Sequence, residues 1–105
     1  MGDYEYPGQG TESDLSTKET VDMPKMYRVT MHNDHYTTME FVVEVLMDVF
    51  HRTEPDAVQI MMNIHQQGSG ICGVYTLDIA ATKTAEVHKR ARERGFPLKC
   101  SYEEA

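Results

Sequence analysis

Three consecutive polar residues, Asn33-Asp34-His35, are the part of the sequence best suited to chemistry. Their amide, carboxylate and imidazole groups accept hydrogen bonds, and the carboxylate can balance a positive charge. Because they stand between an alternating segment and the start of a helical pattern, packing of a core does not require them. Asn and Asp also favour turns by bonding nearby backbone N–H groups, so a simple turn is the alternative interpretation. The position of the cluster favours a recognition site.

Catalytic and metal chemistry are the other hypotheses that these residue types raise. Zinc sites need three or four closely spaced ligands, and the five histidines include no HxxxH pair. No GxSxG motif and no Walker loop is present. Cys72 and His65 could be imagined as nucleophile and base, but Cys72 lies in an apolar run where a thiol usually packs. We therefore expect no metal, no cofactor, no catalytic residues and no enzymatic activity.

The composition limits the class of partner. A net charge of -7 and a pI near 5.1 argue against nucleic acid, because phosphate binding needs clustered Lys and Arg. No apolar stretch is long enough to cross a membrane, and the N-terminus lacks the pattern of a signal peptide. Cys72 and Cys100 match no metal or CxxC spacing, so we expect free buried thiols. These features predict a cytoplasmic monomer that binds neither nucleic acid nor membranes.

Residues 1–25 differ in composition from the rest of the chain. They contain six acidic and two basic residues, with Gly, Ser, Thr and Pro but almost no aliphatic side chains. Such a segment cannot bury enough apolar surface to offset its ordering entropy. We expect a disordered N-terminal extension over residues 1–25 and one folded domain over residues 26–105.

Hydrophobic periodicity predicts the elements that position the polar cluster. Alternation from Met26 to His32 indicates a half-buried strand. Thr37 and Glu40 have the spacing of a capping box, which predicts that a helix begins after Thr37. Its apolar face has helical spacing and consists of Met39, Val42, Val43, Leu46 and Phe50.

Four further elements follow. A helix is expected from Thr53 to Gly68, a strand over residues 71–76, a helix from about 77 to 94, and a strand over residues 98–102. The order β-α-α-β-α-β predicts an α+β two-layer domain, in which a three-stranded sheet packs against three helices. Periodicity alone does not fix the strand directions.

Three longer segments carry a resemblance to a known family: MYRVTMHNDHYTTMEFVVEVL, IMMNIHQQGSGICGVYT and ATKTAEVHKRARERGFPLKC. Together they cover nearly all of residues 26–102, and their NDxYTxMEFV, HxQGxxxCG and PLxC strings are jointly specific. The chain closely resembles the ClpS family, bacterial adaptors that deliver N-end-rule substrates to the Clp protease. The resemblance implies an antiparallel sheet.

The resemblance also implies roles for individual residues. Asn33, Asp34 and His65 fall where the family holds the free α-amino group of a substrate's first residue, and His35 lies in the same cluster. The pocket for that residue's side chain (Phe, Leu, Tyr or Trp) is expected to include Met31, Thr37, Met39, Val42, Met61, Ile64 and Leu98. Tyr36, Asp78 and Lys83 are expected near the surface that docks on the N-terminal domain of the ClpA unfoldase.

Two substitutions depart from the family pattern, and one alternative function stays open. Thr38 replaces a usual proline, which the expected capping box would tolerate. His35 replaces an acidic residue and removes one negative charge beside the amine site. The alternative function is a stand-alone peptide-binding domain without a delivery role. Deleting residues 1–22 would then leave every activity intact, whereas in an adaptor it would abolish substrate hand-over and spare binding.

We predict that His35→Asp tightens the binding of a peptide beginning with Phe at neutral pH, because it adds a negative charge beside the substrate's ammonium. A fluorescence titration measures the effect. Unchanged affinity would contradict the prediction. So would a gain in wild-type affinity on acidification, since a protonated His35 repels the ammonium.

Overall fold

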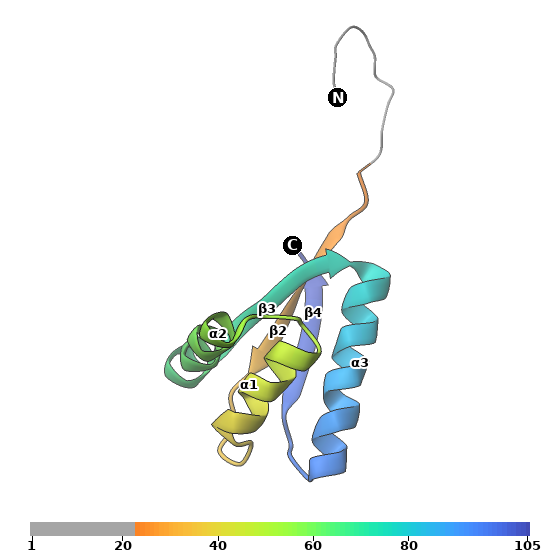
Figure 1. The fold of residues 1–105 in the computed structure, drawn as a ribbon. Coiled ribbons are helices and arrows are strands. Elements are labelled where there is room, and N and C mark those ends of the chain that lie inside the picture. Colours follow the sequence, from red (N-terminus) through yellow and green to blue (C-terminus); the bar gives the residue numbers. More distant parts are fainter. Residues whose placement is uncertain (1–22) are drawn as a thin grey trace, which may run out of the picture.

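The computed structural model describes residues 23–105, so the expected extension lies almost wholly outside the described residues. The elements are β2 (Met26–His32), α1 (Met39–Asp48), α2 (Glu54–Gln67), β3 (Ser69–Thr76), α3 (Leu77–Arg94) and β4 (Lys99–Glu104). This order confirms the sequence-based prediction of β-α-α-β-α-β. In Figure 1 the helix α1 lies in front of the sheet, α3 lies to its right, and α2 lies beside the start of β3.

The sheet is antiparallel with strand order β3-β2-β4, so the central strand β2 bonds to neighbours on both sides. Its register with β3 shifts after Val29, which pairs with Gly73 while Thr30 pairs with Ile71. Cys72 is the extra residue of this β-bulge. The guanidinium of Arg52 donates two hydrogen bonds to the carbonyl of Cys72, at 3.0 and 2.8 Å, which satisfies this carbonyl at the bulge.

The core lies between the sheet and the helices. Val29 and Met31 of β2 are fully buried, as the alternation predicts, and they pack with Phe41 and Leu46 of α1 and Val87 of α3. Each such side chain contributes about 1.5–3 kcal/mol by leaving water. The alternate residues of β2 face the other side of the sheet, which no helix covers completely.

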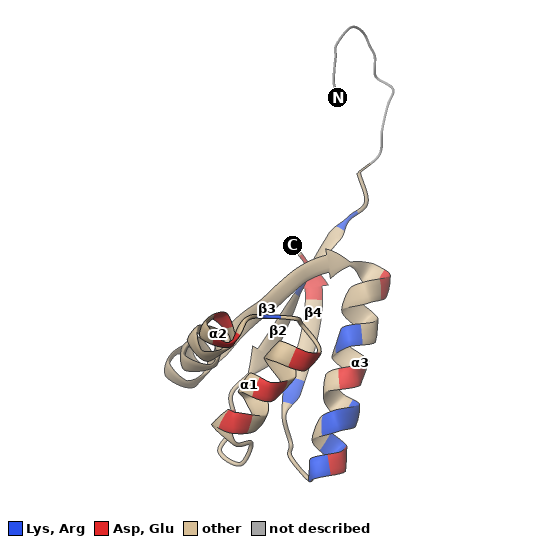
Figure 2. Cartoon of the chain, in the orientation of Figure 1, with Lys and Arg blue, Asp and Glu red and all other residues tan. Residues whose placement is uncertain are grey.

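Charged residues join α1 to α3 at the surface. Arg90 lies 3.5 Å from Asp48, and Arg94 lies 3.6 Å from Glu44. Figure 2 shows the acidic residues of α1 beside the basic residues of the last turns of α3. Because these pairs are exposed, each contributes little to stability. The Arg94 guanidinium also covers the ring of Phe41 at 5.2 Å, which shields this core residue from water.

The start of α1 differs from the sequence-based prediction. The helix begins at Met39, and its N-cap is Thr38, whose hydroxyl accepts a hydrogen bond from the Phe41 N–H at 3.1 Å. The expected capping box of Thr37 and Glu40 is therefore wrong. Thr37 instead bonds back into the preceding loop through its own N–H and hydroxyl. Thr38 caps the helix and Thr37 stabilises the loop before it, and the spacing of the sequence did not predict which threonine does which.

The other helix ends agree with the sequence signals. Thr53 caps α2, and both Gly68 and Gly95 adopt the left-handed conformation that ends α2 and α3. Residues 68–73 have the GxGxxG spacing of a dinucleotide loop, but they run from a helix into a strand, the reverse of what such a loop requires. No helix within residues 23–105 is long and apolar enough to cross a membrane.

We predict that Thr38→Ala lowers the free energy of unfolding by about 1 kcal/mol, because one first-turn N–H of α1 loses its acceptor. Urea denaturation measures this difference. The control Glu40→Ala should cost only about 0.3 kcal/mol, through the lost negative charge at the helix N-terminus. A larger effect of Glu40→Ala than of Thr38→Ala would contradict this prediction and would support the capping box of Thr37 and Glu40.

Candidate functional site

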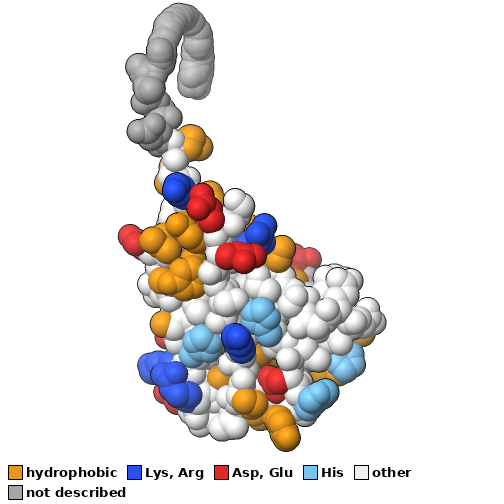
Figure 3. Space-filling model, turned by 180° about the vertical axis from the view of Figure 1, so that it is seen from behind, with side chains coloured by type: hydrophobic (Ala, Val, Ile, Leu, Met, Phe, Trp, Pro, Cys, Tyr) orange, Lys and Arg blue, Asp and Glu red, His pale blue; other side chains and the backbone are white. Residues whose placement is uncertain are grey.

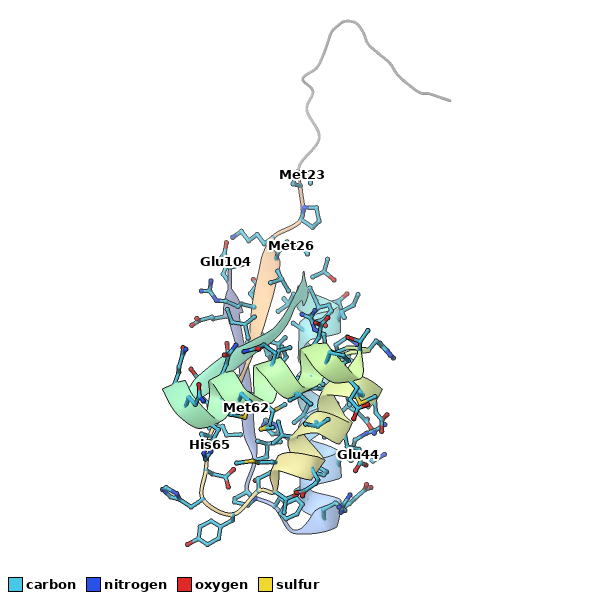
Figure 4. The ribbon with its side chains drawn as sticks, turned by 60° about the vertical axis from the view of Figure 1, so that its left-hand side comes forward. Met23, Met26, Glu44, Met62, His65 and Glu104 are labelled. Atoms are coloured by element: carbon cyan, nitrogen blue, oxygen red, sulfur yellow. The ribbon has the colours of Figure 1, made fainter. Side chains whose placement is uncertain are left out.

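The loop between β2 and α1 is fixed at its first residue. The N–H of Asn33 donates to the carbonyl of Gly68 at 2.9 Å, which ties the end of β2 to the end of α2. Gly68 has a φ of 91°, a conformation that favours glycine. This bond places Asn33 beside the last turn of α2. In Figure 4, His65 of that turn lies next to the start of the loop.

Asp34 organises the rest of the loop. Its Oδ1 accepts hydrogen bonds from the N–H groups of Tyr36 and Thr37, at 2.8 and 2.7 Å. Its Oδ2 accepts the hydroxyl of Thr37 at 2.7 Å. This is the turn geometry that Asp favours. A carboxylate has about four lone-pair sites, so Asp34 retains one on Oδ2 for another donor.

The charge of Asp34 is stabilised by the same bonds. Partial burial works to raise its pKa, but the hydrogen bonds from Thr37 and Tyr36 and the nearby His35 outweigh that effect. The pKa of Asp34 is therefore held below its ordinary value of 3.8. The Asp34 carboxylate is therefore ionised at neutral pH and gives the loop a negative charge. The turn interpretation and the recognition interpretation of Asn33-Asp34 are thus compatible.

A pocket of about 240 Å³ opens between this loop, α1 and α2. Its polar side consists of loop residues and His65, and its apolar side consists of helix residues. The lining residues are Asn33, Asp34, His35, Thr37, Met39, Val42, Met61, Ile64 and His65. Val42 and Ile64 are buried, whereas Met39 is 44% exposed and lies where it can shift over an occupant.

A small recess of about 20 Å³ adjoins the pocket and shares five of its residues. Leu98 and His32 line this recess but not the larger pocket. His32 is the last residue of β2, and its Nε2 lies 2.8 Å from the hydroxyl oxygen of Ser101 in β4. Sequence reasoning gave no role to His32. Its place directly before Asn33 was the one available signal.

The structure brings together nearly all residues that the sequence assigned to binding. The four expected at the amine site, Asn33, Asp34, His35 and His65, all line the pocket. Of the seven expected around the side chain, five line the pocket and Leu98 lines the recess. Met31 lines neither, because it is fully buried in the core.

The three residues expected to dock on a partner do not cluster. Tyr36 is 77% exposed beside the pocket. Asp78 lies in the first turn of α3, at the end of the molecule opposite the loop (Figure 1). Lys83 has an internal role, because its Nζ donates to the Val49 carbonyl at 2.6 Å. A surface that includes all three would extend along the molecule.

The back of the sheet carries a wider, shallower groove of about 600 Å³. Figure 3 shows acidic, basic and histidine side chains interspersed over this face. Arg28 and Glu103 form an exposed ion pair within it, 3.2 Å apart. Apart from Ile71, the side chains that line the groove are polar or charged, so it is less suited than the smaller pocket to hold a hydrophobic side chain.

Catalytic and metal chemistry find no support in the described part of the chain. Cys72 and Cys100 are buried and unpaired, and burial raises the pKa of both thiols, that of Cys100 to about 11. Such thiols are poor nucleophiles at neutral pH. Among residues 23–105, no three His, Cys, Asp or Glu side chains are grouped to hold a metal ion.

We predict that Asp34→Asn destabilises the fold by about 1 kcal/mol at neutral pH, since the amide nitrogen cannot accept the Thr37 hydroxyl. The folded-state pKa of Asp34 is depressed, so its charge stabilises the fold above the unfolded-state value, and that stabilisation disappears as pH falls through the folded-state value. Denaturation at pH 7 and below pH 3.8 should therefore show a difference that shrinks with acid.

Asp48→Asn is the control for this measurement, because its ion pair with Arg90 is exposed and contributes little. A difference between wild type and Asp34→Asn that grows on acidification would contradict the prediction.

Comparisons with known proteins identify the family of the chain. The family model described as "ATP-dependent Clp protease adaptor protein ClpS" matches residues 22–101. A protein of that name from Syntrophus aciditrophicus is 52% identical over 93 residues, covering 89% of this chain and 87% of the relative. One from Nitratidesulfovibrio vulgaris is 54% identical over 95 residues, covering 90% and 91%.

A solved structure shares the fold. The structure of Agrobacterium tumefaciens ClpS2 bound to L-phenylalaninamide is 41% identical in sequence, with a TM-score of 0.76. The match covers 79% of this chain and all of that chain. The fold, the family model and the relatives agree, and the chain belongs to the ClpS family of adaptors of the ATP-dependent Clp protease.

Proposed function

We propose that this adaptor binds N-degrons, that is, proteins with a free α-amino group on a bulky hydrophobic first residue, and delivers them to the ClpA unfoldase. The observation that carries the proposal is the pocket between the loop, α1 and α2, which joins hydrogen-bond acceptors to an apolar cavity. The relative bound to L-phenylalaninamide offers a fitting ligand, because that molecule has a free amine next to a benzyl group.

The polar side of the pocket suits an ammonium group. Asn33 offers an amide oxygen, Asp34 the remaining lone pair of Oδ2, and His65 a ring nitrogen. An ammonium has three N–H donors, which matches three acceptors. Hydrogen bonds to a charged group contribute about 1.5–3 kcal/mol each. The lowered pKa of Asp34 keeps its carboxylate ionised at neutral pH, where the substrate's α-amine is mostly protonated.

The apolar side suits a large hydrophobic side chain. The walls of the pocket are the buried side chains of Val42 and Ile64 and the half-buried side chain of Met61. The exposed Met39 can close over the occupant. Burial of Phe, Leu, Tyr or Trp adds about 1.5–3 kcal/mol. Together these terms reach at most about 12 kcal/mol, and an association cost of at least about 4 kcal/mol leaves about -8 kcal/mol, so micromolar binding is the upper limit. The site binds without altering its ligand, and cleavage belongs to the protease.

Delivery requires contact with the N-terminal domain of ClpA. Tyr36 projects from the loop beside the pocket, so an unfoldase that docks there would lie close to the bound substrate. Asp78 and Lys83 belong to the same proposal, but Lys83 also caps the end of α1. A Lys83 variant would therefore lose stability as well as docking. Such a protein acts in the cytoplasm as a monomer.

The proposal predicts that a peptide beginning with Phe binds, and that acetylation of its α-amino group abolishes detectable binding because buried acceptors then stay unpaired. Fluorescence anisotropy with the full chain measures both. Asn33→Ala should weaken binding of the free peptide by at least about tenfold. Asn63→Ala, on α2 outside the pocket, is the matched control and should bind normally. Equal binding of the free and acetylated peptides would overturn the proposal.

A further inference from the structure

We propose that His88 of α3 is a positioning residue for the pocket. Its imidazole holds the first residues of β4, and with them the Leu98 side chain, so that the pocket discriminates among side chains by size. His88 lines neither the pocket nor the recess beside it, and it acts only through Leu98. The inference rests on the proposed function, because it assumes that the pocket holds the side chain of an N-terminal residue.

A hydrogen bond between α3 and β4 carries the inference. The N–H of Cys100 donates to His88 Nε2 at 3.0 Å. β4 is an edge strand with β2 on one side only, and an N–H on the open side of such a strand lacks a strand partner. In Figure 1, α3 runs beside β4 on this open side. His88 therefore supplies the acceptor that the sheet does not, and it joins β4 to the helix.

A second contact between α3 and β4 is weaker. The Thr84 hydroxyl oxygen lies 4.0 Å from the Sγ of Cys100, and a thiol is a poor donor. Thr84 precedes His88 by one helical turn, so both side chains lie on the same side of α3. Loss of the His88 bond would leave this contact in place. We therefore expect the start of β4 to loosen while the fold survives.

The position of Leu98 depends on its neighbours along the chain. Its side chain is buried and lines the recess, which shares Val42 and Ile64 with the pocket. Among the hydrogen bonds of residues 23–105 outside the helices and strands, none involves the backbone of Leu98. On one side of it, the Phe96 N–H donates to the carbonyl of Ala91 in α3 at 2.8 Å.

On the other side of Leu98 stands the bond from Cys100 to His88. The ladder with β2 begins between these two positions, at Lys99. The segment is thus joined to α3 before and after Leu98, and only the second of these bonds uses a side chain. His88 is for this reason the residue through which a single substitution changes the freedom of Leu98.

A fixed Leu98 makes the pocket selective for size. A wall that cannot move excludes a side chain that is too large and stays in contact with one that is small. If the wall yields, the large side chain gains room and the small one loses contacts. Loss of the His88 bond should therefore shift the preference of the pocket from Leu toward Trp. Because one hydrogen bond is lost, we expect the ratio of affinities to change by about three- to tenfold.

Amino-acid amides test the inference with the full chain. Titration calorimetry compares leucinamide with tryptophanamide on wild type and on three variants. His88→Leu should change the ratio toward tryptophanamide. His88→Gln, whose amide oxygen can accept the Cys100 N–H, should restore the wild-type ratio. Lys89→Leu alters the next, exposed residue of α3 and should also keep the ratio. A variant that merely lowers folding stability would weaken both amides alike.

A second measurement uses wild-type protein alone. Because the Cys100 N–H is a donor, Nε2 of His88 must be unprotonated and the neutral ring carries its proton on Nδ1. The ring ¹⁵N resonances of His88 should show this tautomer at neutral pH, a test that stands even if His88→Leu does not fold.

Two results would overturn the inference and leave the proposed function standing. One is binding of both amides with the same ratio in wild type and His88→Leu, and the other is a His88 ring protonated on Nε2. If neither amide binds wild type, the proposed function itself fails, and the role of His88 in selectivity fails with it.

Discussion

The carboxylate of Asp34 is the interaction on which the site depends. By accepting the N–H groups of Tyr36 and Thr37 and the hydroxyl of Thr37, it shapes the loop that enters α1. The loop in turn forms the polar side of the pocket. One group therefore provides both the local structure and a fixed negative charge. Hydrogen bonds within the chain hold this geometry, which reduces the ordering cost of binding.

The fold supplies the opposite wall and holds it at the right place. The bond from Asn33 N–H to the Gly68 carbonyl joins the loop to the end of α2. That helix carries Ile64 and His65 into the pocket from the other side. The site thus lies where three elements meet, and each presents a different chemistry. The polar groups and the apolar walls thus lie on opposite faces of one cavity, as the proposed selection of a free amine and a hydrophobic side chain requires.

Much of this was predictable from sequence because the signals are local. Alternation in β2, the cap at Thr53 and the glycines after α2 and α3 depend on neighbours within a few residues. The cap of α1 shows the limit of such reasoning. Thr37 and Thr38 are both good N-cap residues. Thr38 caps α1, because the hydroxyl of Thr37 donates to the Asp34 carboxylate.

The sequence by itself determined the element order, the family and most of the buried positions, since these follow from short-range patterns and quoted motifs. For α1 the expected apolar face included Met39, which is exposed, and missed Phe41 and Val45, which are fully buried. Only the tertiary structure decided which residues share a cavity. In that structure Met31 is buried in the core, and Lys83 donates a hydrogen bond at the end of α1. His32 and Leu98 line the same recess. Those outcomes depend on contacts between residues tens of positions apart, which no local pattern encodes.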